Sequence, residues 1–292
     1  MSRLHLAGII PLANLKTDFQ LAIPEVLLPI GPGFSAIQKS VFECAMAGCN
    51  TIWIVANDDL APIIREIVGD WVYDPVYYHS PAKFSSEQRK EIPIYYVPIH
   101  PKDRDRRDSY GWSVLYGIHC AWRVAHNISQ WITPDKYYIS FPLSTFDVYQ
   151  VRTWRRAISD PKKNFFFTHK KSHIKNNLPI SFTMTGEDFK LCRRTINKKT
   201  TREYLPPSPG QQYPSQKLPL QNRWSARYFT LQDVFEAVDD KDAHKVELDW
   251  YYDISDWGGY RNFLSSDNII NTPEEHLTKP HSHVKLPYTS EE

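Results

Sequence analysis

The sequence predicts an α/β fold in which a Rossmann-like, doubly wound mixed sheet carries helices on both faces. Strand-like and helix-like stretches alternate through the first 168 residues, which is the order that this fold class requires. The strand-like stretches are continuous apolar runs, as expected for strands covered on both faces. The chain of 292 residues is 41% hydrophobic and 23% charged. It is therefore long enough for one large core and has the composition of an ordinary globular protein.

Five strands are expected in this first part, each at an apolar run. They cover residues 6–13, 51–55, 92–99, 137–141 and 164–168. Strands that are joined by helices in this order run parallel, with right-handed crossovers.

Helices are expected where apolar residues recur at helical spacing. The first covers residues 34–47, with Gly48 at its C-cap. The second begins after Asp58 or Asp59, either of which can cap it, and stops near Gly69. The third covers residues 112–128. It carries His119 and His126 on one face, a spacing more typical of structural histidines than of a metal site.

The organisation changes after about Arg193. Residues 197–224 are dense in Pro, Gln, Lys and Arg and have almost no apolar periodicity, which predicts a loop or an extended arm. Order returns with a helix over 231–238, capped by Thr230, and a short strand over 245–248. The predicted α/β domain spans residues 1–268, and residues 269–292 are expected to form a flexible tail.

Charge and cysteine content narrow the function classes. The 35 basic and 33 acidic residues give a net charge of +2, so the whole molecule does not attract nucleic acid. Basic residues gather at 102–107, 152–175 and 193–202. They are interpreted first as solvated loops and second as a rim that binds phosphate or a polyanion. The four cysteines form no CxxC pair, so reduced core thiols are expected.

The N-terminal apolar run is too short to span a membrane and lacks a signal-peptide cleavage pattern. A cytoplasmic protein with no membrane association is expected.

Three segments, taken together, resemble the sugar-phosphate nucleotidyltransferase (NDP-sugar pyrophosphorylase) family. Its members join a nucleoside triphosphate to a sugar 1-phosphate and release pyrophosphate. The segments are AGIIPLANLKTDFQLAIPEVLLPIGPGFSAIQKSVFECAMAGCNTIWIVAND, YGWSVLYGIHCAWRVA and LDWYYDISDWGGYRNFL. The first keeps the family's LLPI and its AG before a strand. The second stands where the family has a Leu-Gly-Thr-Ala motif, and the third is similar to its closing W-x-D-x-G-T-x-x-x-Y motif. The resemblance covers about residues 5–265 and implies a nucleotidyltransferase (GT-A-like) fold.

The resemblance also implies which positions form the site. The family's phosphate loop, GxGTR, falls on Asn14-Leu15-Lys16-Thr17-Asp18, and the lysine of its Pro-Lys falls on Glu25. Asp253 falls on the family's late metal-binding aspartate, so a Mg²⁺ ion is implied if the protein is active. The implied nucleotide-binding residues are Ala13, Asn14, Lys16, Thr17 and Gly111.

These positions predict a degenerate catalytic loop. Asp18 and Glu25 are anions where the family has cations. At about 4 Å and an effective dielectric of about 20, each reversal turns an attraction of ~4 kcal/mol into a repulsion of similar size. The family's strand-ending Gly-Asp is Phe141-Pro142 here, and Asp147 is several residues out of register. No catalytic residue is assigned, and Asp253 without a second ligand is more simply a loop-ordering aspartate.

Three functions remain open. The favoured one is a nucleotidyltransferase-fold protein that has lost catalysis and binds or scaffolds, with a protein partner or a second copy docking on the arm. The alternative is a divergent active enzyme that uses Lys16, Arg104, Arg106 and Arg107 as its cations. Trp112, in place of a small threonine, is expected to crowd its base pocket. The third is nucleic-acid binding through the basic segments.

Overall fold

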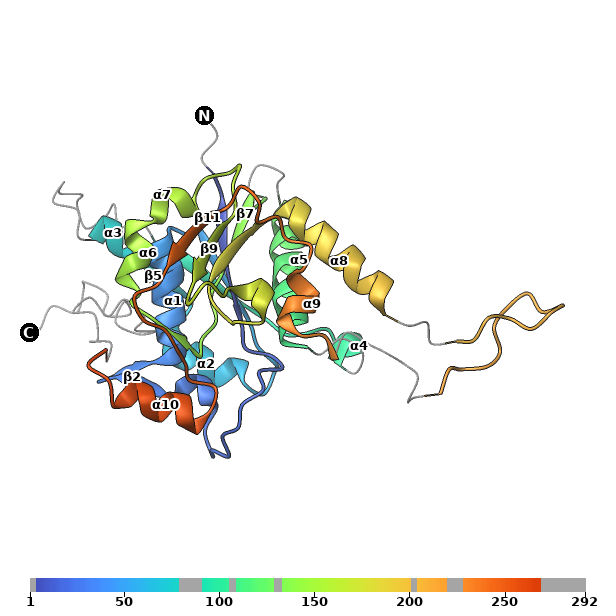
Figure 1. The fold of residues 1–292 in the computed structure, drawn as a ribbon, viewed down its shortest axis with the longest axis horizontal. Coiled ribbons are helices and arrows are strands. Elements are labelled where there is room, and N and C mark those ends of the chain that lie inside the picture. Colours follow the sequence, from blue (N-terminus) through green and yellow to red (C-terminus); the bar gives the residue numbers. More distant parts are fainter. Residues whose placement is uncertain are drawn as a thin grey trace, which may run out of the picture.

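A mixed sheet of eight strands forms the centre of the computed structural model (Figure 1). The structure describes residues 4–78, 91–104, 109–128, 133–200, 204–219 and 228–268. The strand order is β11-β9-β10-β7-β1-β4-β6-β5. Neighbouring pairs among the four central strands, β7, β1, β4 and β6, run parallel. Their bounds are Lys136–Ile139, Leu6–Pro11, Thr51–Val55 and Glu91–Val97.

The outer strands make the sheet mixed. β5 (Trp71–Tyr73) pairs antiparallel with β6 at one edge. On the other side, β10 (Phe182–Thr185) lies antiparallel to both β7 and β9 (Phe165–Thr168). β11 (His244–Glu247) runs parallel to β9 and closes that edge. The predicted doubly wound mixed sheet is therefore confirmed.

The chain reverses its direction of travel across the sheet at β1. β4 and then β6 are added on one side of β1, whereas β7 is added on the other side. In open α/β sheets, such a switch point leaves a crevice outside the carboxyl ends of the two strands, and ligands bind there. The fold thus predicts a binding site at the ends of β1 and β7.

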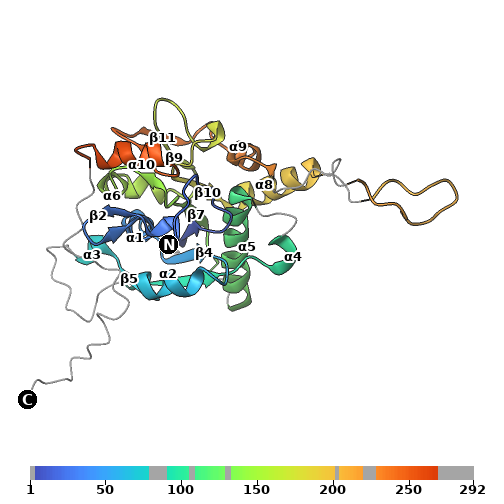
Figure 2. The ribbon, with the colours of Figure 1, turned by 90° about the horizontal axis from the view of Figure 1, so that it is seen from below.

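Helices cover both faces of the sheet, and each face has its own apolar core (Figures 1 and 2). One face carries α1 (Ala36–Ala47), α2 (Ala61–Val68), α6 (Tyr149–Thr153), α7 (Arg155–Ile158) and α10 (Trp257–Leu264). The other carries α5 (Tyr110–Ile128), α8 (Gly186–Lys199) and α9 (Leu231–Phe235). Within the described ranges, no helix combines the length and the apolar character needed to cross a lipid bilayer.

Short elements complete the chain. They are η1 (Glu25–Leu27), β2 (Pro29–Gly31), β3 (Phe34–Ser35), α3 (Pro75–Tyr78), α4 (Pro101–Arg104), β8 (Ser144–Thr145), η4 (Ile174–Asn176) and β12 (Tyr252–Asp253). β12 pairs antiparallel with β8 and so brings the closing motif to the end of β7.

The helix boundaries confirm some of the predicted caps and correct others. Gly48 has a φ of 88°, the left-handed conformation that favours glycine at a helix end. Thr230 accepts a hydrogen bond from Asp233 N, so it caps α9 as predicted. The prediction that Asp58 or Asp59 caps α2 is wrong, because Leu60 is the N-cap and no side chain of the N-cap residue bonds to the first turn.

The predicted arm begins later than expected, because α8 continues to Lys199. The part of the arm that the structure describes, residues 204–219, extends away from the body beyond α8 (Figures 1 and 2). Tyr204 and Lys217 form an antiparallel bridge across it, and Leu205 N donates to Gln216 O over 2.9 Å. The predicted tail, 269–292, lies outside the described residues.

Candidate functional site

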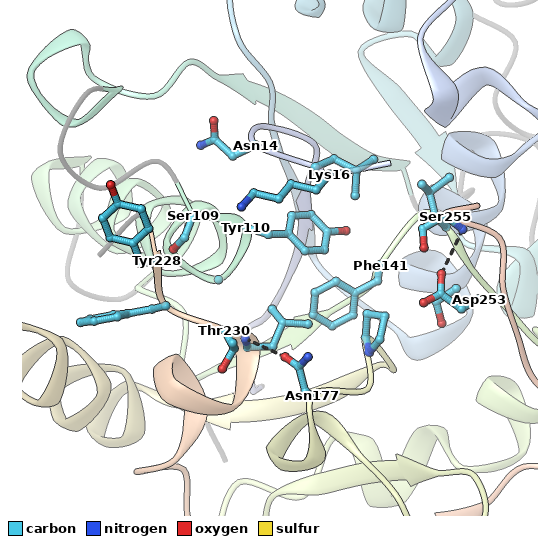
Figure 3. A pocket seen from close by; sticks show the side chains of 17 residues that line it. Asn14, Lys16, Ser109, Tyr110, Phe141, Asn177, Tyr228, Thr230, Asp253 and Ser255 are labelled. Atoms are coloured by element: carbon cyan, nitrogen blue, oxygen red, sulfur yellow. Dashed lines mark hydrogen bonds between the residues drawn. The ribbon is translucent and has the colours of Figure 1, made fainter. Parts of the chain in front are cut away.

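A pocket of about 330 Å³ lies at the switch point of the sheet (Figure 3). Loops that follow β1 and β7 form two of its walls. The first turn of α5, the segment before α9, and the residues around β12 form the others. Segments far apart in the sequence therefore meet where the topology predicts a crevice.

Asn14 turns the loop after β1. Its φ of 60° is left-handed, a conformation that asparagine adopts more readily than most residues other than glycine. This asparagine thus keeps a turn at the position where the family resemblance has its first glycine. Its side-chain Nδ2 is buried and has no hydrogen-bond partner among the described residues. A buried donor without a partner is rare in folded proteins, and this one belongs to a residue that lines the pocket.

The first turn of α5 forms the wall opposite. Ser109 Oγ accepts from Trp112 N over 3.2 Å and so caps the helix, which begins two residues before its predicted start. Gly111 also lines the pocket, and a Cβ there would lie 2.8 Å from Val234 Cγ2 of α9. A larger residue would push α9 away, so glycine allows α5 and α9 to meet at the pocket rim.

Tyr110 presents its phenol to the pocket from the same turn (Figure 3). Its ring lies 5.5 Å from the ring of Phe141, and its hydroxyl is buried without a hydrogen-bond partner among the described residues. Burial raises the pKa of Tyr110 well above its usual value, and the charge of Asp253 raises it further. The phenol therefore keeps its proton and remains a hydrogen-bond donor at neutral pH.

A buried ion pair holds the loop after β7 in place. Lys39 Nζ of α1 donates to the carbonyls of Phe141 and Ser144, over 3.3 and 2.5 Å. It also donates to Glu43 Oε2 over 2.9 Å, and the side chains of both members of this pair are fully buried. The pocket wall is thus fixed from beneath by an ammonium group that does not reach the pocket itself.

The pocket holds one lysine and one carboxylate among the described residues that line it, Lys16 and Asp253. Lys16 is exposed and extends over the pocket toward Ser109 and Tyr110 (Figure 3). Asp253 Oδ1 accepts from Ser255 N over 3.0 Å, as expected for a loop-ordering aspartate. Asn14, Lys16, Gly111 and Asp253, expected from the resemblance, thus share one pocket, and their binding roles stay predictions.

Four other positions implied by the resemblance do not line the pocket. Ala13 is buried, and its carbonyl accepts from Ser113 Oγ over 2.7 Å. Thr17 Oγ1 donates to Glu25 Oε1 over 2.9 Å, while Asp18 is exposed and its N–H donates to Ser255 O. The two anions that replace family cations therefore stand outside the pocket lining, although Asp18 is joined to the lining residue Ser255.

A two-carboxylate Mg²⁺ site does not fit the described residues. Mg²⁺ prefers carboxylate oxygens together with water and phosphate, and the resemblance implies two aspartates. Asp253 lines the pocket, but Asp147 does not, and its Oδ1 accepts from Tyr149 N over 3.0 Å. The other implied aspartate falls on Pro142, whose side chain offers no ligand, and Phe141 before it lines the pocket. Within the described ranges, no three His, Cys, Asp or Glu side chains cluster.

The proposed cations of an active enzyme are only partly described. Arg106 and Arg107, and the side chain of Arg104, lie outside the described part of the chain. The expectation that Trp112 crowds the base pocket is wrong, because its side chain is buried and lines a different pocket on the far side of α5.

Sequence reasoning did not single out Tyr110, Asn177 or the segment before α9 as lining residues. Asn177, with a φ of 64°, accepts from Leu231 N over 3.1 Å and so ties η4 to α9 (Figure 3). A contact between residues 54 positions apart leaves no local signal in the sequence. The sequence YGW marks the start of a helix, but no local pattern predicts that the Tyr110 side chain turns toward the pocket.

Two solved structures have a similar arrangement of strands and helices. One from Bacillus anthracis, named as a glucose-1-phosphate thymidylyltransferase and bound to sucrose, has a TM-score of 0.57 at 10% identity. The match covers 93% of this chain and 98% of that one. A UDP-glucose pyrophosphorylase complexed with UDP-glucose has a TM-score of 0.53 at 13% identity, over 89% of this chain and 97% of its own.

No protein-family model matches the chain, and no curated protein matches its sequence. At these identities the likeness establishes the fold alone. The fold is an α/β nucleotidyltransferase-like fold with a mixed sheet of eight strands flanked by helices.

Proposed function

We propose that this protein uses a nucleotidyltransferase-like fold as a binding module. Its ligand is a sugar or a nucleoside that carries at most one phosphate group, bound in the switch-point pocket without nucleotidyl transfer. The observation that carries this proposal is the pair of buried donors, Asn14 Nδ2 and Tyr110 Oη, which lack partners among the described residues. An unsatisfied buried polar group costs about 1–3 kcal/mol, which a ligand oxygen at each donor would offset.

The lining supports a ligand of low charge. Aromatic rings of Tyr110, Phe141 and Phe229 offer faces for a sugar or a base, and Asn14 and Lys16 offer donors. A triphosphate needs several cations or a metal held by carboxylates to neutralise it during transfer. One exposed lysine and one carboxylate in the described lining do not supply that neutralisation.

The alternative, an active and divergent nucleotidyltransferase, is favoured by one observation. Lys16 and Asp253 share the pocket at the ends of β1 and β7, where the family resemblance implies the nucleotide and the metal. This alternative predicts that a nucleoside triphosphate binds more tightly with magnesium than without it.

Thermal unfolding separates the two functions. The four nucleoside monophosphates, the corresponding triphosphates, glucose and glucose 1-phosphate are each tested with and without magnesium. A ligand at about 100 times its dissociation constant stabilises the folded state by ~2.7 kcal/mol, which raises the unfolding midpoint by several degrees. The proposal expects a shift with a monophosphate or a sugar that magnesium does not change. A shift confined to one triphosphate with magnesium, followed by pyrophosphate release, would overturn it.

A matched pair of variants assigns the binding to this pocket. Tyr110→Phe removes the unpaired hydroxyl, whereas Tyr95→Phe removes a hydroxyl from an exposed ring that stacks on Trp53 in the sheet. Only Tyr110→Phe should weaken binding. Equal binding by both variants would place the ligand elsewhere.

We further propose that the arm, residues 204–219, docks on a protein partner or a second copy. All but one of its residues are exposed, and Tyr213 is 75% exposed. Prolines stiffen the arm and lower the entropy that docking would cost. Light scattering after size-exclusion chromatography tests for a second copy. Replacing residues 204–219 with a short Gly-Ser linker should convert an oligomer to a monomer.

Nucleic-acid binding through the basic segments is a further outcome of the same work. It predicts an affinity for single-stranded or double-stranded oligonucleotides that falls steeply between about 50 and 200 mM salt. Binding that is insensitive to salt would exclude it.

A further inference from the structure

A second pocket, of about 200 Å³, lies on the opposite side of α5 from the switch-point pocket. None of the residues that line it also lines the first pocket. One face of α5 forms its floor, because the α5 residues that line it recur three and four positions apart. They are Trp112, Leu115, Tyr116, His119, Cys120 and Arg123.

Two other elements complete the walls. Arg193 reaches in from α8, while His100 and Asp103 come from the start of α4. The described charges that line the pocket are thus two guanidinium groups and one carboxylate, so cations are in excess whether or not the histidines are protonated.

A contact between Arg193 and His119 indicates which nitrogen of the His119 ring carries the proton. Arg193 Nη1 lies 3.4 Å from His119 Nδ1. A guanidinium can only donate, so Nδ1 accepts and the proton of the neutral ring is on Nε2. The same guanidinium lies over the ring of Phe189, with its Cζ 5.5 Å from the ring centre, and this cation–π contact helps to hold it in place. His119 and the two arginines therefore offer donors to the pocket.

The charges of both arginines, Arg123 and Arg193, act on the ring of His119. Burial lowers the pKa of His119 first, and the charges of Arg193 and then Arg123 lower it further. Asp103 opposes them with a smaller effect. The other titratable groups of this pocket are His100, Tyr116 and Cys120. His119 is consequently neutral at pH 7, and an anion placed among these groups would raise its pKa.

We propose that this second pocket binds a small phosphorylated compound whose phosphate group is held by Arg123, Arg193 and His119. Planar guanidinium groups bind phosphate oxygens in pairs, which favours phosphate over a single carboxylate. The apolar floor of Trp112 and Leu115 fits the body of an organic ligand. This site is independent of the function proposed for the first pocket.

The test follows the His119 ring by proton–carbon NMR in the full-length protein, with the signal assigned from His119→Gln. Inorganic phosphate, glucose 1-phosphate and AMP are titrated separately at fixed pH and ionic strength. Saturation should raise the pKa of His119. A preference for an organic phosphate over inorganic phosphate identifies the apolar floor as part of the site, and equal affinity limits the site to phosphate alone.

Three arginine variants assign the binding. Arg123→Gln and Arg193→Gln should each weaken phosphate binding about tenfold or more, because each removes charge-assisted hydrogen bonds. Arg194→Gln is the matched control, since Arg194 is the next residue on α8, is exposed and does not line the pocket. Unchanged circular dichroism and unfolding midpoints verify that the variants fold. Arg123 is exposed, so its variant remains informative even if Arg193→Gln does not fold.

Two results would overturn the proposal. One is a His119 pKa that does not change up to millimolar phosphate. The other is equal loss of affinity in all three arginine variants, which indicates a general charge effect. Tyr110→Phe should leave the His119 response unchanged, so failure at this site and failure of the function proposed for the first pocket are distinguishable.

Discussion

Two groups of polar side chains lie on either side of the loop after β7, and they differ in how their hydrogen bonds are satisfied. Beneath the loop, Glu43 accepts from Lys39 Nζ, Tyr138 Oη, Ser140 Oγ and Ser181 Oγ. All five of these residues are fully buried in an otherwise apolar core.

Above the loop, Asn14 and Tyr110 line the pocket, and their buried donors have no partner among the described residues. The buried network is closed on itself, so it contributes to holding the fold and leaves little for a ligand to bind. The pocket donors stabilise nothing within the described chain. In these two groups, the paired side chains stabilise the fold, and the unpaired donors beside the pocket are the ones that we propose for binding.

The largest expected effect on stability comes from removing Glu43, the acceptor at the centre of the buried network. Glu43→Ala leaves the Lys39 ammonium buried without its carboxylate, which should lower the free energy of unfolding by about 3–5 kcal/mol. Urea denaturation measures the change. The double variant Lys39→Met, Glu43→Leu removes both charges but leaves three hydroxyls and two carbonyls without these partners, so it should recover only part of the loss. A loss below about 1 kcal/mol in Glu43→Ala would mean that water reaches the network.

A second buried group whose hydrogen bonds are satisfied, at Lys136, makes stability depend on pH. Lys136 Nζ donates to the carbonyls of Ile158, Asp160 and Lys163 over 2.9, 2.8 and 2.6 Å. Burial lowers the pKa of Lys136 from 10.5 to about 8. The unfolded chain therefore holds this proton more firmly between pH 8 and pH 10, so the free energy of unfolding rises with pH in that window.

The expected rise between pH 8 and pH 9.5 is about 1–2 kcal/mol. It is measured by urea denaturation at closely spaced pH values. Lys136→Met should remove this part of the slope. An identical slope in the variant would assign the pH dependence to other groups.

Removing an unpaired donor beside the pocket should have the opposite effect on stability. Tyr110→Phe removes a buried hydroxyl that has no partner among the described residues, so the free energy of unfolding should rise by about 1–3 kcal/mol. Affinity for the best monophosphate or sugar should fall about tenfold, because that hydroxyl donates to the ligand. Isothermal titration calorimetry measures the affinity. A marked loss of stability with unchanged affinity would contradict the comparison.

The smallest effect is expected at Asp253. Asp253→Asn keeps an oxygen that can accept from Ser255 N, so stability and magnesium-independent binding should both stay within about 0.5 kcal/mol of the unaltered protein. Unfolding midpoints with ligand, with and without magnesium, measure this. A magnesium-dependent shift that is lost in the Asp253→Asn variant would revive the active-enzyme alternative.

Much of the fold could be predicted from the sequence because its central strands are uninterrupted apolar runs. β5 and β10 were missed because each is short, and the threonines in β10 hide its burial. α8 was missed because its buried stripe is narrow: Phe189, Cys192 and Ile196 are its buried apolar residues. The capping box from Thr185 to Asp188 was the local signal that marked its start.

The candidate site was only partly predictable for a different reason. The family resemblance located Asn14, Lys16, Gly111 and Asp253 around one pocket by their place in the chain. It could not show that the Glu25 side chain turns to Thr17 instead of the pocket. Side-chain direction depends on neighbours that are distant in sequence, and a motif position does not encode them.

α5 separates the two pockets, with Gly111 lining one and Trp112 lining the other. A ligand that changes the position or rigidity of this helix in either pocket acts on a wall of both. Thermodynamic linkage then requires the effect to be reciprocal: the factor by which a phosphate compound changes affinity in the switch-point pocket equals the factor measured in the other direction. Titrating one pocket while the other is saturated measures whether this shared helix couples the two sites.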